Sequence, residues 1–278
     1  MNRVLPLVVA VLLATPASAA VVYDFRQVNR SDGINAKPAE ATGKGIIDGT
    51  RSRIEFTGGN LYPAGTVILS LIGQREVTLL NPEQKSYATI DVAAIASRIG
   101  AANLEITNFK TRVEQLPGQP MVSGFPTTHY RIVTNYDITW KPGSIELTQR
   151  VESIIEKWTT SAFGDVAETF LEGQPFRTGN PELDKIITAE MAKVKGLPLR
   201  QVTTTTTTGV GNLVRTGGQL PERPSRTQSS EILLSNVRIE TIPEVLFEIP
   251  NGFRPADGTT EDGPSMHILS LEPEPSAP

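Results

Sequence analysis

The chain has 278 residues, of which 38% are hydrophobic and 20% charged, with a formal net charge of −4 at pH 7. This composition is typical of a globular protein and excludes a disordered or fibrous chain, and the acidic balance predicts no nucleic-acid partner. The absence of cysteine excludes disulfides, thiolate metal sites, cysteine nucleophiles and a lipid-modified N-terminal cysteine.

Residues 1–19 have the pattern of a secretory signal peptide. Arg3 precedes an apolar run over residues 4–13, and the small residues Ala17, Ser18 and Ala19 follow. This pattern predicts cleavage after Ala19 and a periplasmic or secreted protein. The apolar run is shorter than the roughly 20 residues that a membrane helix needs, and no later stretch reaches that length. We therefore expect a protein that does not span the membrane.

A period of two dominates the sequence that follows. Residues 21–28 and 51–56 alternate between apolar and polar side chains, as half-buried strands do. Residues 66–72 are apolar on both faces, which favours a strand covered on both sides. Residues 75–80 and 86–90 flank a polar loop that begins with Asn-Pro, and this arrangement predicts a β-hairpin.

Two helices are expected from capping signals. Asp91 can cap a short helix over residues 92–99, which Gly100 would end. Asn180 and Pro181 begin a longer helix, which ends near residue 195 before a glycine. Its apolar stripe is expected to cover a sheet; the stripe comprises Leu183, Ile186, Ile187, Met191 and Val194.

The segment over residues 144–163 is ambiguous. Val151, Ile154, Ile155 and Trp158 have helical spacing, but the same residues fit a long strand, and periodicity does not decide between them.

Six consecutive threonines, residues 203–208, favour a strand over a linker or a glycosylated stalk. Threonine is β-branched and prefers strands, whereas linkers are rich in Gly, Ser or Pro. Residues 209–218 are expected to form a turn region.

The C-terminal part is expected to end the fold with one irregular strand. Residues 232–239 form a strand whose apolar phase slips at Ser235 and Asn236, which indicates a bulge or a turn. Residues 242–250 are expected to return to the core. Residues 255–278, rich in Gly, Pro and acidic residues, are expected to form a disordered tail.

Motifs for catalysis, nucleotide binding or metal binding are absent from the sequence. Of the two histidines, His129 lies in a strand-like stretch and is interpreted as an ordinary sheet residue. A hydrolase that uses His129 as a base and Ser123 as a nucleophile is an outlying hypothesis, because sequence proximity is not triad geometry. No catalytic residue, cofactor or metal is assigned.

The order of several segments resembles the LolA/LolB superfamily of lipoprotein carriers, and exported domains of unknown function within it. The segments are GIIDGTRSRIEF, LLNPEQKSYATID, GFPTTHYRI, EKWTTSAFG, GLPLR and IPEVLFEIPNGF. The resemblance implies a mainly β (α+β) fold: a curved antiparallel half-barrel sheet with helices that cover its concave face. It also implies one domain over residues 20–254 and a strand at EKWTTSAFG. The buried arginine of the carriers has no fixed counterpart, although Arg51 and Arg53 lie near the corresponding strand.

The resemblance implies an exported, non-enzymatic binding protein that holds a lipid, acyl chain or other apolar ligand between the sheet and helical lids. The expected lining comprises Phe25, Ile54, Phe56, Leu69, Leu79 and Tyr87 on strands, with Ile95, Ile99, Ile187 and Met191 on helices. The alternative is that these residues form a closed core. The protein would then be an envelope scaffold that interacts with other envelope proteins and has no ligand cavity.

Overall fold

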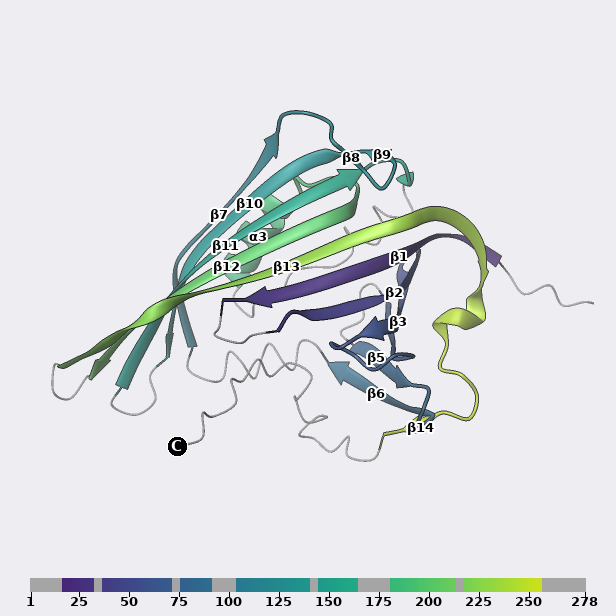
Figure 1. The fold of residues 1–278 in the computed structure, drawn as a ribbon, viewed down its shortest axis with the longest axis horizontal. Helices are drawn as coiled ribbons and strands as arrows, with labels where there is room; N and C mark the ends of the chain where they lie inside the picture. The colour runs from purple at the N-terminus through teal and green to yellow at the C-terminus, as the bar shows by residue number, and fades with distance from the viewer. Residues whose placement is uncertain are drawn as a thin grey trace, which may run out of the picture.

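The computed structural model contains one large, strongly curved sheet (Figure 1). Its twelve strands follow the order β14-β6-β5-β4-β3-β2-β1-β13-β12-β11-β10-β7, and β8 and β9 form a separate two-stranded sheet. The sheet is open, with β7 and β14 at its two edges, so the expected curved and mainly antiparallel sheet is confirmed. The structure describes residues 17–32, 37–71, 76–91, 104–140, 145–164, 181–213 and 218–256.

The N-terminal half of the sheet is a meander of six antiparallel strands. They are β1 (Ala17–Ser31), β2 (Ala39–Asp48), β3 (Arg51–Gly59), β4 (Val67–Leu71), β5 (Glu76–Asn81) and β6 (Ser86–Asp91). The predicted hairpin is confirmed as β5–β6, and the Asn81 side chain accepts a hydrogen bond from the Gln84 N–H in its turn. Strand β1 begins before the expected cleavage point, because Ala17 already pairs with Pro243. Cleavage after Ala19 stays a prediction.

The other half consists of long strands: β7 (Leu104–Leu116), β10 (Thr128–Trp140), β11 (Ile145–Thr160), β12 (Leu197–Leu213) and β13 (Gly218–Pro243). The short strands β8 (Met121–Val122) and β9 (Phe125–Pro126) lie between β7 and β10 in the sequence. The ambiguous segment is strand β11, which ends at Thr160, so the strand implied at EKWTTSAFG is confirmed for its first five residues. The threonine run is part of β12, as expected. The turn expected over residues 209–218 is wrong for its first half, because β12 continues to Leu213 with register shifts at Gly209.

The phase slip in β13 is confirmed as a bulge. The register with β1 shifts between Val22 and Asp24, and Asn236 has a positive φ of 51°. Because the bulge adds a residue to one strand, both Leu234 and Val237 can face the same core.

The C-terminal segment departs from expectation. After β13 the chain forms a short 3-10 helix, η1 (Glu244–Phe247), and a two-residue strand, β14 (Arg254–Pro255), parallel to β6. The return of residues 242–250 to the core is only partly correct, since Leu246 and Phe247 pack on a small cluster but Val245 is 62% exposed. Pro255, expected in the tail, pairs with Tyr87, and residues 257–278 lie outside the described part of the chain.

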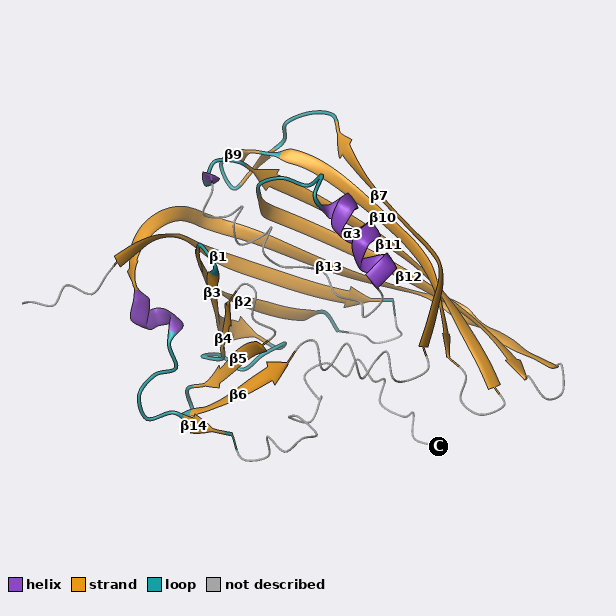
Figure 2. Ribbon diagram, turned by 180° about the vertical axis from the view of Figure 1, so that it is seen from behind, coloured by secondary structure: helices purple, strands orange, loops and turns teal. Residues whose placement is uncertain are grey.

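The longer predicted helix is confirmed as α3 (Pro181–Met191), which contacts the edge strand β7 (Figure 2). Its apolar stripe is only partly covered: Leu183 is buried, whereas Ile186 is 44% exposed. The helix expected over residues 92–99 lies outside the described residues. The expected covering of the concave face by helices is thus not established beyond the contact of α3 with β7.

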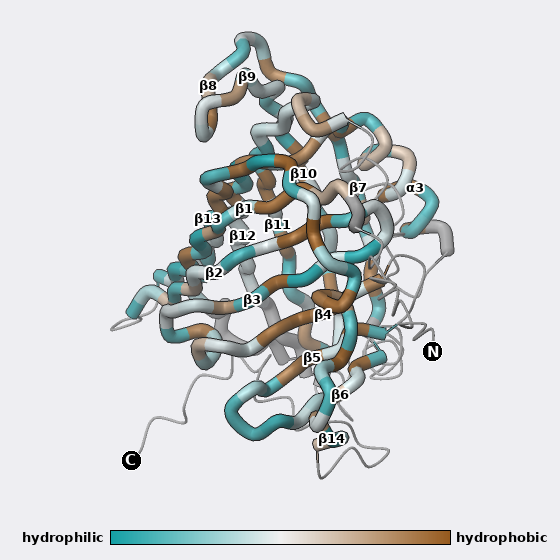
Figure 3. The backbone as a smooth tube through the Cα atoms, turned by 90° about the vertical axis from the view of Figure 1, so that its right-hand side faces the viewer, coloured by the Kyte–Doolittle hydropathy of each residue, from teal (hydrophilic) through white to brown (hydrophobic). Residues whose placement is uncertain are grey.

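Side chains alternate between the two faces of the sheet, and the pairing register assigns each residue to one of them. We call the concave side, on which α3 lies in Figure 2, the inner face, and the opposite side the outer face. The main core lies on the inner face of β1–β3 and of the adjoining parts of β12 and β13, and it includes Tyr23, Phe25, Phe56 and Leu234. Apolar and polar segments alternate accordingly along the strands in Figure 3.

Candidate functional site on the inner face

The inner face of β1–β3 is filled by aromatic rings. Phe25 and Phe56 meet edge to face with ring centroids 5.7 Å apart, and Tyr62 stacks on Phe56 at 4.1 Å. Burial raises the pKa of the Tyr23 hydroxyl to about 12. This part of the inner face is a packed core.

Two glycines of β2 make room for these rings. A Cβ on Gly43 would lie 2.2 Å from the Glu55 carbonyl oxygen and 2.5 Å from the Phe25 ring, and one on Gly45 would lie 2.0 Å from the Tyr23 ring. The rings therefore lie directly over the backbone of β2, and no larger residue fits beneath them.

The structure separates the residues that were expected to line a cavity. Phe25, Ile54 and Phe56 belong to the inner core, and Leu79 faces the same side because it pairs with Ile68. Leu69 and Tyr87 lie on the outer face instead, in a cluster with Val67, Leu80 and Phe253. Ile187 and Met191 lie half-buried on α3, which packs on β7 at the other edge of the sheet, and Ile95 and Ile99 lie outside the described residues.

The inner face changes character along the long strands. Beyond the core, the inner face of β10 and β11 carries apolar residues that are buried or half-buried, with the polar residues Thr134, Gln149 and Ser153 between them. The apolar residues are Ile132, Tyr136, Ile138, Leu147, Val151 and Ile155. At the far end, Trp140 is 45% exposed, and Ile106 on β7, which pairs with Ile138, is 36% exposed. This band of β10–β11 residues, with Trp140 and Ile106, is called the apolar strip below.

Neutral polar side chains lie beside the apolar strip, on the inner face of β12, β13 and β1. Gln201 donates to Thr203 Oγ1, Ser230 Oγ donates to Asn29 Oδ1 at 2.8 Å, and Gln27 donates to the same Asn29 oxygen. These groups satisfy one another without any charge. The threonines of β12 divide between the two faces, and Thr203 and Thr205 face inward with Gln201.

Lys157 is a charged residue within this neutral surface. It lies on the inner face of β11 between Tyr130 of β10 and Gln201 of β12 and is half-buried. Burial lowers its pKa, because desolvation disfavours the ammonium form. Among the described residues, no hydrogen bond or ion pair of the Lys157 amine is found.

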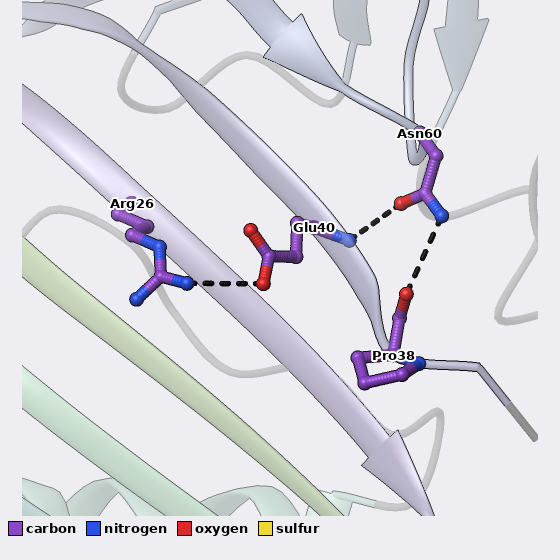
Figure 4. A network of polar contacts seen from close by, with 4 residues as sticks. All are labelled: Arg26, Pro38, Glu40 and Asn60. Carbon is purple, nitrogen blue, oxygen red and sulfur yellow. Dashed lines mark hydrogen bonds and ion pairs between the residues drawn. The ribbon is translucent and has the colours of Figure 1, made fainter.

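The outer face carries ion pairs between neighbouring strands. They are Arg26–Glu40, Arg131–Glu156, Arg150–Asp137 and Arg200–Glu231, with N–O distances between 2.7 and 3.2 Å. Figure 4 shows one network of this kind, in which Arg26 pairs with Glu40 and the Asn60 side chain bonds the Glu40 N–H and the Pro38 carbonyl. Such a surface is solvated and holds neighbouring strands in register.

His129 also lies on the outer face. Its imidazole ring stacks on the Trp158 ring, with the ring centroids 4.2 Å apart. The Arg200 guanidinium lies over the same Trp158 ring, 4.7 Å from its centroid. Burial lowers the pKa of His129, with Glu156 opposing that shift. The Ser123 hydroxyl donates a hydrogen bond to the Leu234 carbonyl oxygen. This hydrogen bond and the stacking of His129 on Trp158 therefore do not join Ser123 to His129.

Among the described residues no group of three or more His, Cys, Asp or Glu side chains could hold a metal ion. Within the same residues, none of the helices has the length and apolar character that crossing a membrane requires.

Comparison with known proteins gives a distant likeness in structure but none in sequence. No protein-family model matches the chain, and no curated protein matches its sequence. Among solved structures, a LolA superfamily protein from Nitrosomonas europaea is similar over 82% of this chain and 90% of its own, with 7% identity and a TM-score of 0.27.

Sequence reasoning did not single out Lys157 or the apolar strip. The sequence contains the information for both, because every second residue from Leu147 to Lys157 shares a face if residues 145–160 form a strand. The helical spacing of Val151, Ile154, Ile155 and Trp158 concealed it, since the two faces of β11 are both partly apolar.

Proposed function

We propose that the mature chain is an exported, non-enzymatic binding protein that holds a lipid, acyl chain or other apolar ligand against the inner face of β10 and β11. The observation that carries this proposal is the apolar strip, which continues beyond the packed core to Trp140, 45% exposed, and Ile106, 36% exposed. The outer face of the same strands is occupied by ion pairs, so the inner face is the one suited to an apolar ligand.

The physical basis is burial of methylene groups. Each buried methylene contributes about 0.8 kcal/mol, and the exposed Trp140 end of the strip offers apolar area that water otherwise covers. The neutral polar groups beside the strip already bond one another, as Ser230 bonds Asn29. A ligand chain lying along the strip therefore leaves those hydrogen bonds intact.

An envelope scaffold without a ligand is the second candidate. Exposed apolar side chains at the other end of the molecule favour it, namely Met121 (64%), Ile239 (55%) and Val245 (62%). Exposed apolar groups of this kind are typical of interaction surfaces. This candidate requires no bound ligand on the inner face.

Native mass spectrometry of the protein from the exported fraction, followed by organic extraction, distinguishes the two. We expect a mass above that of residues 20–278, reduced to the polypeptide mass by extraction, with an acyl-chain compound in the extract. Trp140→Glu should lose this compound, and Leu233→Glu, at a 38% exposed outer-face position, should keep it. A ligand-free mass, with no retention of added oleyl alcohol, would favour the scaffold. The polypeptide mass also tests cleavage after Ala19.

A further inference from the structure

The inner face of β10, β11 and β12 is neutral over a long distance and then carries one cation. The described inward side chains from Leu147 to Ile155 on β11, from Tyr130 to Trp140 on β10 and from Gln201 to Thr207 on β12 are uncharged. Lys157 is the exception, at the end of the apolar strip nearest the core.

The charged groups that share the inner side do not neutralise Lys157. On α3, the Glu190 carboxylate accepts the Val113 N–H at 2.8 Å and pairs with Lys193. The carboxylates of β11 and β13 closest in sequence and register, Glu156 and Glu231, lie on the outer face and pair with Arg131 and Arg200. Tyr130, across from Lys157, carries no carboxylate.

An ammonium held in such a place without an anion is costly. Half-burial removes part of its water, and no described group supplies a counter-charge. A ligand anion would supply one, and a charge-assisted hydrogen bond to it is stronger than a neutral one.

The apolar strip that extends from Lys157 indicates that the anionic ligand also has an extended apolar chain. Lys157 and Val151 are six positions apart on β11, about 20 Å along the strand, and the inward residues between them are Ile155 and Ser153. An extended acyl chain whose head group meets Lys157 would run over Ile155 and Ile132 toward Val151 and Tyr136.

We propose that Lys157 is the head-group site of the inner face, and that the ligand is a single-chain amphiphile with an anionic head, a carboxylate or a phosphate monoester. This inference rests on the proposed function, because it assigns the ligand class of the same apolar strip. Gln201, beside Lys157, is placed to donate a second hydrogen bond to the same head group.

The test compares ligands that differ only in the head group. Oleic acid, oleoyl lysophosphatidic acid and oleyl alcohol are titrated at neutral pH into the delipidated mature protein, its Lys157→Met variant and its Lys44→Met variant. Met keeps much of the lysine stem and removes the charge. Lys44 is an exposed lysine on the outer face of β2, so its variant is the matched control for net charge.

We expect the wild type to bind one or both anionic ligands more tightly than the alcohol. Lys157→Met should weaken the preferred anionic ligand about ten- to hundredfold and leave the alcohol unchanged, whereas Lys44→Met should change neither. Oleate and lysophosphatidate then identify which head group is preferred. Because an anion raises the pKa of Lys157, affinity for the acid should fall as pH rises through the pKa of the complex, and the variant should lack that dependence.

The variant is expected to fold, since methionine relieves the desolvation of an unpaired ammonium, and a thermal melt checks this. Equal binding of acid and alcohol by the wild type, with no effect of Lys157→Met, would overturn the inference and leave the binding function standing. Equal weakening of acid and alcohol in the variant would also overturn it, by showing a structural role alone. Failure of the wild type to bind any of the three ligands would contradict the proposed function itself.

Discussion

The two faces of the sheet differ in charge and in burial. On the long strands the outer face joins neighbouring strands through solvated ion pairs such as Arg131–Glu156, whereas the inner face of the sheet carries aromatic rings, aliphatic side chains and neutral amides and hydroxyls. The inner face is therefore where burial decides stability and where an apolar ligand gains most. The ion-paired part of the outer face is expected to tolerate change, unlike its buried clusters around Val22 and Leu80.

The largest effect expected on this comparison comes from the inner core. Phe56→Ala should lower the free energy of unfolding by about 3–5 kcal/mol, because Phe56 is 4% exposed and contacts both Phe25 and Tyr62. Leu233→Ala, on the outer face, should cost less than about 1 kcal/mol. Urea unfolding of both variants measures the difference, and similar losses would contradict the contrast between the faces.

A smaller loss of stability is expected where the aromatic rings of the inner core lie on the backbone of β2. Gly43→Ala should destabilise the protein by about 1–3 kcal/mol, because its Cβ would lie 2.2 Å from the Glu55 carbonyl oxygen. Gly58→Ala is the control, since its Cβ would approach only Thr42 Oγ1, at 3.1 Å. Thermal melts compare the two variants, and equal melting temperatures would show that β2 can move away from the rings.

A buried carboxylate on the outer face gives a pH-dependent effect. A hydrogen bond from Asn108 Nδ2, helped by Arg150, holds the pKa of Asp137 below its usual range. Its stabilising contribution is therefore full above the unfolded-state pKa and is lost as pH falls through the folded-state pKa. Asp137→Asn should reduce stability at neutral pH and flatten its decline on acidification. An unchanged acid limb in urea titrations at several pH values would contradict this.

The smallest effect is expected for the exposed pair Arg26–Glu40, whose side chains are 57% and 41% exposed. A double-mutant cycle with Arg26→Met and Glu40→Gln should give a coupling of about 0–1 kcal/mol that shrinks at high salt. A coupling above about 2 kcal/mol would mean that the outer face contributes more to stability than solvated pairs do.

Local pattern predicted much of the fold. The alternation in residues 21–28 and 51–56, the Asn-Pro hairpin, the Pro181 helix and the slip at Asn236 each correspond to an element of the structure. Strand β2 has no alternating pattern that predicts it, because Gly43 and Gly45 occupy positions where apolar side chains would otherwise stand. Only the three-dimensional packing of Phe25 and Tyr23 explains those glycines.

The candidate site was harder to predict. Alternation shows which residues share a face of a strand, but it does not show which face is the concave side of the sheet. Strand β4 is apolar on both faces, so the sequence does not show that Ile68 faces inward and Leu69 outward. Tyr87 is placed on the outer face by its contact with Phe253, almost 170 residues later in the chain. The inward position of Lys157 follows from the pairing of β11 with β10 and β12, which the sequence does not give.

The two tryptophans allow the most direct test of inner-face binding. Trp140 lies on the inner face and Trp158 on the outer face, so Trp158→Phe and Trp140→Phe each leave one reporter. Titration with an alcohol whose chain carries bromine, a short-range quencher, should quench Trp140 emission in the first variant and leave Trp158 emission unchanged in the second. Equal quenching of both, or quenching of neither, would contradict binding along the inner face.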